Sequence, residues 1–248
     1  MRYTAPISRL ASVAGFFVLW QLCVLLFSPE LLPSPHQVLV RIMEQWQADE
    51  LQRHLRVTLW RVFVSFGIAM FLGLMLGMIM GSSNKADIAL DGPLTVFLNV
   101  PALVVIILSF LWFGLTEQAV IIAVLLNKVP NMTVIFREGV RAINADLLEV
   151  GRVYGLSWSR RLRSIYLPQL YPYFLAATRT GLALVWKIVL VVELLGCSDG
   201  LGFKLGVFFQ YFDIEGVLAY SFAFVVVILC IEGLILRPWE RSVMRWRT

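Results

Sequence analysis

Long apolar stretches, separated by short polar segments, restrict the fold of this sequence more than any other feature. A helix needs about 20 consecutive, mostly apolar residues to cross the hydrocarbon core of a bilayer. Six stretches approach or reach this length, at residues 10–27, 58–80, 94–113, 119–136, 171–195 and 217–236. They predict an all-α membrane protein with six transmembrane helices. Only residues 114–117 separate the third stretch from the fourth, which predicts a helical hairpin.

The composition and the charges agree with a membrane protein. Hydrophobic residues make up 59% of the chain and charged residues 15%, with a mean hydropathy of +0.80, whereas about 25% of a typical soluble domain is charged. The net charge of +5 is spread between the apolar stretches, so we expect no nucleic-acid partner. The three cysteines and two histidines are too scattered for a metal site or a disulfide framework.

The positive charges predict how the chain is oriented. Cytoplasmic loops of membrane proteins are rich in Lys and Arg. With the N-terminus placed inside, the outer segments hold only Arg41, Arg53, Arg56 and Lys204, and most other Lys and Arg residues lie inside. We therefore expect a multi-pass protein of the bacterial inner membrane with both termini in the cytoplasm. The run at 10–27 is longer than the apolar core of a signal peptide, so we expect it to remain as a helix.

The chain divides into two predicted parts. Residues 1–57 hold the first transmembrane helix and an outer segment, which is expected to form an amphipathic helix on the outer surface. Residues 58–248 form a core of five transmembrane helices with a long inner loop at 137–168.

This inner loop reads as two short helices joined by a turn. Asn144 or Asp146 can cap the first helix, because their side chains accept hydrogen bonds from free backbone N–H groups. Gly155 is expected to end it, since glycine adopts the left-handed conformation at little cost. The second helix is expected from Ser157 to about residue 165, where Pro168 stops it and opens the fifth crossing. The resulting apolar ridge and basic flank suit either a soluble protein partner or anionic lipid.

The same loop carries a motif with defined spacing. Glu149, Gly155, Ile165, Leu167 and Pro168 follow the pattern E-x5-G-x9-I-x-L-P. This pattern resembles the EAA motif of binding-protein-dependent ABC transport permeases. In that family the motif forms a coupling helix, which docks into a groove on the ATPase subunit.

The resemblance implies a type I ABC importer permease fold with a cytoplasmic coupling helix. Val150 and Gly151 stand where the motif has two alanines, and both are small enough to keep the docking face. The residues that the resemblance assigns to ATPase coupling are Asp146, Leu147, Glu149, Val150, Gly151, Tyr154, Gly155, Leu156, Ile165, Leu167 and Pro168.

Other segments are similar to the nitrate/sulfonate/taurine branch of that family. By this resemblance, Gly200, Leu201 and Gly202 form part of a periplasmic gate. A proline that the branch often carries in its third crossing is absent here, because residues 104–108 are all apolar. The similar segments are Leu32-Pro33-Ser34-Pro35, His54-Leu55, Thr58-Leu59-Trp60-Arg61, Trp112-Phe113-Gly114 and Glu193 with the glycine turn that follows it.

The sequence contains no Gly-x4-Gly-Lys-Ser/Thr phosphate-binding loop. ATP and Mg²⁺ are therefore expected on a separate ATP-binding cassette ATPase, and we expect the chain itself neither to be an enzyme nor to bind a cofactor. The resemblance also implies a second permease copy, in a homodimer, and a periplasmic or lipid-anchored solute-binding protein. Membrane lipid is expected around the helices.

Charged residues inside a bilayer are costly and often functional. Lys128 and Lys187 lie nine or ten residues from the outer ends of their predicted helices, which is about 13–15 Å deep. We predict that both lysines and Glu193 line a translocation path and that the lysines favour an anion. Alternatively, Lys128 bonds to carbonyl groups that Pro130 leaves free, Lys187 pairs with Glu193, or either lysine reaches the membrane surface.

Together these features predict the permease subunit of an ATP-driven importer. Its cargo is expected to be a small anionic solute, similar to nitrate, a sulfonate or taurine, moved by alternating access. The alternative is an ATP-independent secondary transporter of a small anion, which would also hold buried charges but would need no ATPase dock. A membrane-embedded enzyme would need catalytic groups at depth, and the sequence offers little besides Glu193.

Overall fold

The structure is a computed structural model that describes the backbone of residues 4–27 and 32–244 and the side chains of residues 12–27 and 32–240. This described part is helical and contains no strand, in agreement with the predicted all-α fold. Its elements are α1 (Thr4–Phe27), α2 (Pro35–Gln47), α3 (Glu50–Ser82), α4 (Asn84–Asn99), α5 (Ala102–Phe113), α6 (Glu117–Arg141), α7 (Ala145–Val153), α8 (Trp158–Arg161), the π-helical turn η1 (Leu162–Tyr166), α9 (Leu167–Gly196), α10 (Leu201–Gln210), α11 (Ile214–Ile231), the π-helical turn η2 (Glu232–Leu236) and α12 (Arg237–Met244).

The predicted number of six transmembrane helices is not confirmed. Among the described residues, four helices are long and apolar enough to cross a bilayer: Glu50–Ser82, Glu117–Arg141, Trp158–Gly196 and Ile214–Glu240. The bent pair α4 and α5 would make a fifth span. In α1 the part with described side chains, Ser12–Phe27, is apolar but shorter than these spans. Helix α3 starts at Glu50, so the predicted division at residues 57 and 58 falls inside it.

The third predicted crossing, at 94–113, is wrong as a continuous helix. The chain bends by 97° between α4 and α5. Pro101 causes the break, because proline lacks an N–H group and forces the residue before it into an extended conformation. Val100 accordingly has φ −69° and ψ 127°.

Pro168 does not stop the helix that precedes it, which corrects a second prediction. Helix α8 continues through η1 into α9, so that residues Trp158–Gly196 form one helix of 39 residues. In η1 the N–H group of Leu167 bonds to the carbonyl of Leu162, five residues back. This wider turn accommodates a proline ring that would clash with the carbonyl four residues back in a regular α-helix. The π-helical turn η2 likewise precedes Pro238.

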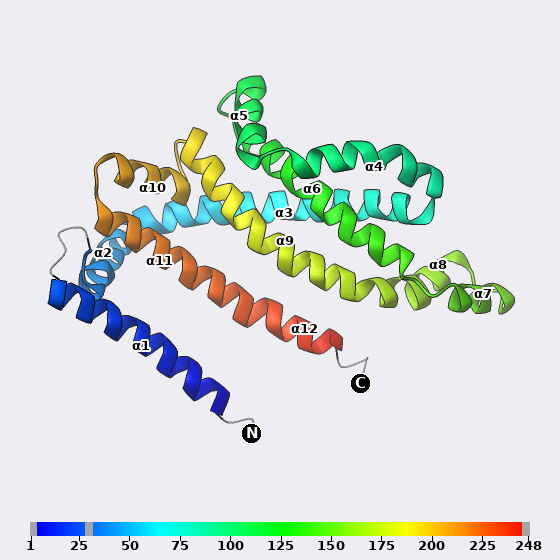
Figure 1. The fold of residues 1–248 in the computed structure, drawn as a ribbon, viewed down its shortest axis with the longest axis horizontal. Helices are drawn as coiled ribbons and strands as arrows, with labels where there is room; N and C mark the ends of the chain where they lie inside the picture. Colours follow the sequence, from blue (N-terminus) through cyan, green and yellow to red (C-terminus); the bar gives the residue numbers. More distant parts are fainter. Residues whose placement is uncertain (1–3, 28–31, 245–248) are drawn as a thin grey trace.

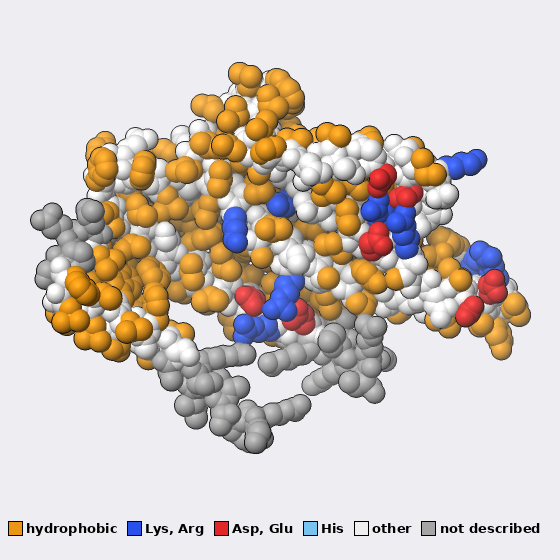
Figure 2. All heavy atoms as spheres, viewed as in Figure 1, with side chains coloured by type: hydrophobic (Ala, Val, Ile, Leu, Met, Phe, Trp, Pro, Cys, Tyr) orange, Lys and Arg blue, Asp and Glu red, His pale blue; other side chains and the backbone are white. Residues whose placement is uncertain are grey.

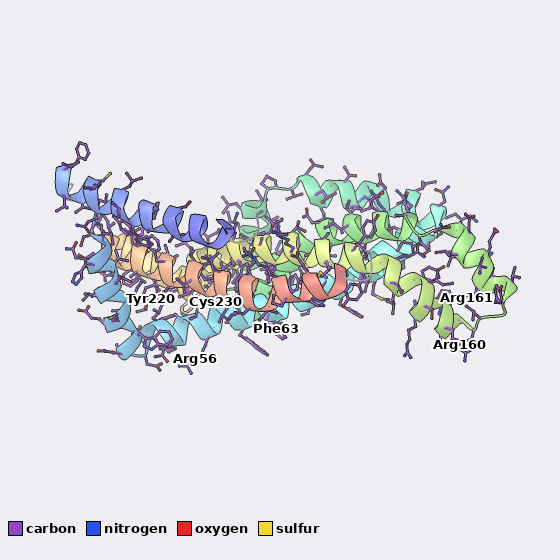
Figure 3. All side chains as sticks on the ribbon, turned by 90° about the horizontal axis from the view of Figure 1, so that it is seen from below. Arg56, Phe63, Arg160, Arg161, Tyr220 and Cys230 are labelled. Atoms are coloured by element: carbon purple, nitrogen blue, oxygen red, sulfur yellow. The ribbon has the colours of Figure 1, made fainter. Side chains whose placement is uncertain are left out.

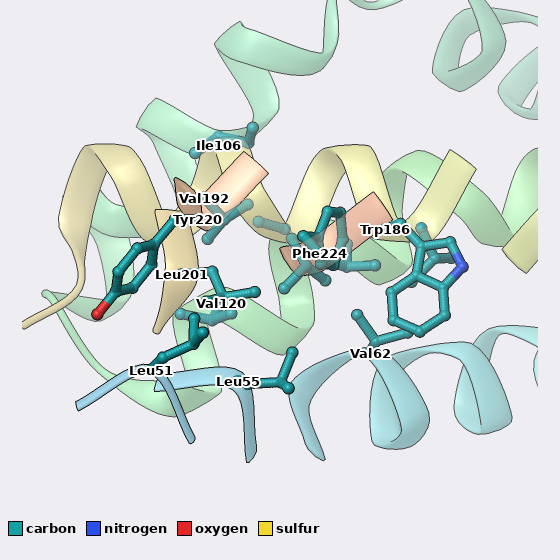
Figure 4. Packing of buried hydrophobic residues seen from close by; sticks show 14 of the residues in the cluster. Leu51, Leu55, Val62, Ile106, Val120, Trp186, Val192, Leu201, Tyr220 and Phe224 are labelled. Carbon is teal, nitrogen blue, oxygen red and sulfur yellow. The ribbon is translucent and has the colours of Figure 1, made fainter. Parts of the chain in front are cut away.

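Helices α3, α6 and α9 form the centre of the molecule. Gly77 on α3 lies so close to α6 that a Cβ atom there would be 2.5 Å from Cβ of Phe136. Gly139 on α6 lies equally close to the Tyr173 ring on α9. Small residues at such positions let membrane helices approach closely enough for their backbones to pack. An apolar cluster that includes Leu51, Val62, Val120, Val185, Trp186 and Phe224 fills the space between these helices, α10 and α11 (Figure 4).

Helix α2 packs against the start of α11, and it occupies the region where an amphipathic outer helix was predicted. Ser34 caps it, accepting a hydrogen bond from the N–H group of Gln37. Arg41 forms an ion pair of 3.0 Å with Asp213, which caps the N-terminus of α11. One side of α2 buries Val38, and the other stays exposed.

The molecule has two distinct ends, seen in Figure 1. Helices α7 and α8 project at one end, while α2, α10 and the start of α11 lie at the other. Helix α1 runs toward the α2 end, and α11 and α12 run away from it. Hydrophobic side chains cover most of the face shown in Figure 2, and charged ones gather in a few places.

Candidate functional site

Helix α7 is a short, well-capped helix at the projecting end. The Asn144 side chain accepts a hydrogen bond of 2.8 Å from the N–H group of Asp146, so Asn144 is the cap. At the other end Gly155 has φ +61°. Its N–H group bonds to the Arg152 carbonyl at 2.9 Å, and that of Leu156 bonds to the Gly151 carbonyl at 3.0 Å. This pair of bonds is a Schellman motif, and the predicted end of the helix at Gly155 is confirmed.

Two residues of the sequence motif hold α7 against the helix that follows it. A Cβ atom on Gly151 would lie 2.7 Å from Cδ1 of Ile165 in η1. The motif needs a small residue at this position because α7 and η1 touch there, and glycine leaves the most room. The contact fixes the angle of α7 relative to α9, since η1 continues directly into α9.

The outward face of α7 is apolar and exposed. Leu147 and Val150 are each about half exposed, at 47% and 49%, and Tyr154 is 79% exposed. Asp146 and Glu149 are also exposed, and neither forms an ion pair with the described residues. An exposed apolar patch rimmed by polar residues is typical of a surface that binds another protein. The remaining motif residues lie nearby, Leu156 and Ile165 half-buried and Leu167 and Pro168 exposed.

Lys128 lies near the middle of α6, and Lys187 lies nine residues before the end of α9. Lys128 is only 7% exposed, whereas Lys187 is exposed on the surface of the protomer. Neither forms an ion pair or hydrogen bond within the described part of the chain. Lys128 therefore does not bond to a carbonyl freed by Pro130, and Lys187 does not pair with Glu193.

The register of α6 and α9 places the two lysines at one level. Gly139 lies against Tyr173 and Met132 lies against Gly181, so the two helices run in opposite directions. By this register Lys128 lies beside residues 184–185 of α9. Lys187 is two or three residues away, which is about 4 Å along the helix axis.

Glu193 lies in a buried network at the opposite end of the molecule from α7. Its side chain is fully buried and accepts hydrogen bonds from Arg61 at 3.0 Å, from the Thr58 hydroxyl at 2.9 Å and from the N–H group of Gly202 at 2.9 Å. Arg61 also pairs with Glu117 and with Asp199. The network joins α3, α6, α9 and the segment before α10.

Side chains from other helices cap the start of α10. The N–H group of Gly200 donates to Nδ1 of His54 at 3.0 Å, and that of Leu201 donates to the Thr58 hydroxyl at 2.8 Å. A third N–H group, that of Gly202, donates to the Glu193 carboxylate. The free N–H groups at a helix N-terminus carry partial positive charge, so a buried carboxylate is well placed there.

The two glycines allow this close approach. Gly200 has φ +99°, and a Cβ atom on it would lie 2.6 Å from Oε2 of Glu193. A Cβ atom on Gly202 would lie 2.7 Å from Cβ of Glu193. The residues predicted to form a gate, 200–202, are thus brought together with Glu193 but not with the two lysines.

A cleft of about 560 Å³ borders this network. Its lining includes Arg61, Glu117, Cys197, Asp199 and Gln210. Sequence reasoning missed the roles of Arg61, Glu117 and Asp199. An arginine within an apolar run, as at Arg61, was the available signal, because buried charges in membrane helices are rare and need partners.

Comparisons with known proteins identify the family of the chain. Residues 69–237 match the family described as binding-protein-dependent transport system inner membrane component. The chain is 30% identical over 220 residues to a Bacillus subtilis (strain 168) protein described as an aliphatic sulfonates transport permease, SsuC, covering 89% of this chain and 79% of that protein. It is 27% identical to the taurine transport system permease protein TauC of Escherichia coli (strain K12), covering 99% and 94%.

Solved structures show the same fold. An inward-facing structure of the MetNI methionine ABC transporter contains a chain that matches 74% of this protein and 93% of its own length. The TM-score is 0.57 at 16% identity. The chain therefore belongs to the binding-protein-dependent transport system inner membrane component family, and it is the membrane-spanning permease part of an ATP-driven importer.

Proposed function

We propose that two copies of this chain form a path across the bacterial inner membrane and that α7 of each copy docks on a separate ATP-binding cassette ATPase. The exposed, doubly capped α7 carries this proposal, because its apolar ridge has no partner within the described chain. The ATPase would hold ATP and Mg²⁺. A periplasmic or lipid-anchored solute-binding protein would deliver the cargo at the α10 end, and both termini would lie in the cytoplasm.

The continuous helix from Trp158 to Gly196 supplies a mechanism. Its 39 residues span about 58 Å. Gly151 and Ile165 fix α7 to its inner end, and Glu193 anchors the cap of α10 near its outer end. Movement of α7 by the ATPase would thus reach residues 200–202 through one rigid element, as alternating access requires.

The cargo is a small anion in this proposal. Lys128 and Lys187 lie at one level inside the long helices without an acidic partner in the described residues. An unpaired cation at such depth is costly, and a bound anion would stabilise either lysine. The names of SsuC and TauC, which refer to sulfonates and taurine, support the same class of solute.

Reconstitution tests the proposal and the alternative of secondary transport. The chain, its ATPase and its solute-binding protein are placed in proteoliposomes, and uptake of radiolabelled taurine and ethanesulfonate is measured with ATP or with a non-hydrolysable analogue. Uptake that needs ATP hydrolysis and the ATPase supports the importer. Equal uptake by the chain alone, without ATP, would establish a secondary transporter instead.

A further inference from the structure

The segment formed by α8 and η1 carries positive charge that no acid in the described chain neutralises. Arg160 and Arg163 are exposed, Arg161 is half-buried, and none of them forms an ion pair with the described residues. Between Glu149 and Glu193 the sequence contains neither Asp nor Glu. Figure 3 shows Arg160 and Arg161 at the projecting end of the molecule.

Aromatic side chains order part of this segment. The Arg161 guanidinium lies 5.7 Å from the centre of the Trp158 ring, and that ring lies 5.6 Å from the Tyr166 ring. Arg161 is therefore held against Trp158 by a cation–π contact. Arg160 and Arg163, three residues apart in the same helix, remain available to a partner on a shared face.

The length of the helix decides between lipid and protein as that partner. The Trp239 indole donates a hydrogen bond of 3.2 Å to the Tyr171 hydroxyl. Trp and Tyr are enriched at membrane surfaces, so we take this pair to mark the level of the surface. Arg163 and Arg160 precede Tyr171 by eight and eleven residues, which places them about 12–16 Å farther along the helix. Charge interactions are screened over about 8–10 Å at moderate salt, so at this distance from the membrane surface the arginines interact only weakly with lipid headgroups.

We propose that Arg160 and Arg163 form a second contact surface that binds carboxylates on the ATPase subunit beside the α7 dock. This inference rests on the proposed docking of α7. Guanidinium groups bind carboxylates through two parallel hydrogen bonds. The surface sets the rate and the orientation of docking, whereas the apolar ridge of α7 sets how long the complex lasts.

The neighbouring charges support one orientation. Helix α7 carries the exposed Asp146 and Glu149 beside one exposed arginine, Arg152, whereas the charged side chains of α8 and η1 are all basic, so the projecting end has a more acidic side and a basic side. A partner with the opposite pattern fits in one orientation only, because the reversed one brings like charges together.

Association kinetics test the inference. The full-length permease is placed in phosphatidylcholine nanodiscs, and binding of its purified ATPase subunit is followed by stopped-flow fluorescence at 50 and 300 mM NaCl. R160E/R163E is compared with the wild type and with K85E, which reverses another exposed cation that has no acidic partner in the described chain. We expect R160E/R163E to lower the association rate constant about tenfold at low salt and to remove most of its salt dependence. K85E should behave as the wild type.

Three results would overturn the inference. In the first, R160E/R163E leaves the association rate constant unchanged while Tyr154→Ala abolishes binding. The arginines would then have no part in docking, but α7 would still be the dock. An effect of R160E/R163E seen only when the nanodiscs contain phosphatidylglycerol would assign the arginines to lipid. A wild-type permease that binds no ATPase at all would overturn both this inference and the proposed function.

Discussion

Arg61 on α3 and Glu193 on α9 form an ion pair of 3.0 Å in which the two side chains are only 2% and 0% exposed. The pair ties the N-terminal part of α3 to the C-terminal part of α9 and holds the carboxylate that caps α10. If Arg61 is lost, Glu193 is left as a buried charge, whereas Arg61 also pairs with Glu117 and Asp199.

Arg61→Met should therefore destabilise the protein by about 3–5 kcal/mol, because Glu193 would be left buried without its counter-ion. Arg53→Met is the matched control on the same helix. Arg53 is exposed, and its side-chain partners among the described residues are Glu50 and His54. Such surface pairs contribute at most about 1 kcal/mol. Thermal unfolding in detergent measures both. Equal melting temperatures for the two variants would show that the buried pair does not hold the fold together.

Gly77→Ala should lower the melting temperature, since the new Cβ atom would lie 2.5 Å from Cβ of Phe136 and 2.9 Å from the Arg137 backbone nitrogen. Overpacking of this kind costs about 1–3 kcal/mol. Gly67→Ala, on the same helix, meets no atom within 4 Å and should be neutral or stabilising. A larger drop in melting temperature for Gly67→Ala than for Gly77→Ala would contradict the close packing of α3 on α6 at Gly77.

Gly151→Val should uncouple ATP hydrolysis from transport, because the larger side chain pushes α7 away from Ile165. Replacing Ile165 by Ala in the same chain restores space, so G151V/I165A should recover part of the transported solute per ATP hydrolysed. The measurement is the ratio of uptake to phosphate release in proteoliposomes. A ratio that stays normal in Gly151→Val would show that the contact does not fix the angle of α7.

Lys187→Met should reduce anion uptake about tenfold or more, because a cation about 4 Å from the transported anion would stabilise it by about 4 kcal/mol at an effective dielectric constant of about 20. Lys85→Met, at an exposed position at the start of α4, should leave uptake unchanged. Initial rates of taurine and ethanesulfonate uptake check both variants, with membrane expression as the control. If both single variants, Lys187→Met and Lys128→Met, transport at normal rates, the lysines do not take part in anion transport.

Cys197 should react slowly with maleimide at neutral pH. Burial raises the pKa of its thiol to about 12, with nearby carboxylates adding to the effect and Arg61 opposing it. The thiol is the protonated form, so a raised pKa keeps it unreactive, and labelling should increase about tenfold per pH unit toward that value. In a variant with Cys23→Ser and Cys230→Ser, labelling is followed by mass spectrometry, with unfolded protein as reference. Fast labelling at pH 7 would contradict the burial of this thiol.

The sequence predicted the local features well. The cap at Asn144, the helix end at Gly155 and the exposed ridge of α7 depend on residues within a few positions of one another, and each has a distinct signature. The long apolar helices were predicted for the same reason.

Features that depend on distant residues were harder to predict. Arg61 meets Glu193 and Asp199 only after folding, 132 and 138 residues apart. Pro101 and Pro168 are equally strong helix breakers in sequence, yet one bends the chain and the other follows a π-helical turn that absorbs it. The difference lies in the geometry of the preceding turn, which composition does not reveal.

Photocrosslinking from two tyrosines tests the central claim most directly. Tyr154 on the α7 end is 79% exposed and Tyr211 at the opposite end is 80% exposed, so each can be replaced by benzoylphenylalanine without disturbing the core. In cells that express the whole transporter, position 154 should crosslink to the ATPase and position 211 should not. Crosslinking of the ATPase through position 211, or through neither position in a transporter that retains ATP-driven uptake, would contradict the assignment of α7 as the dock.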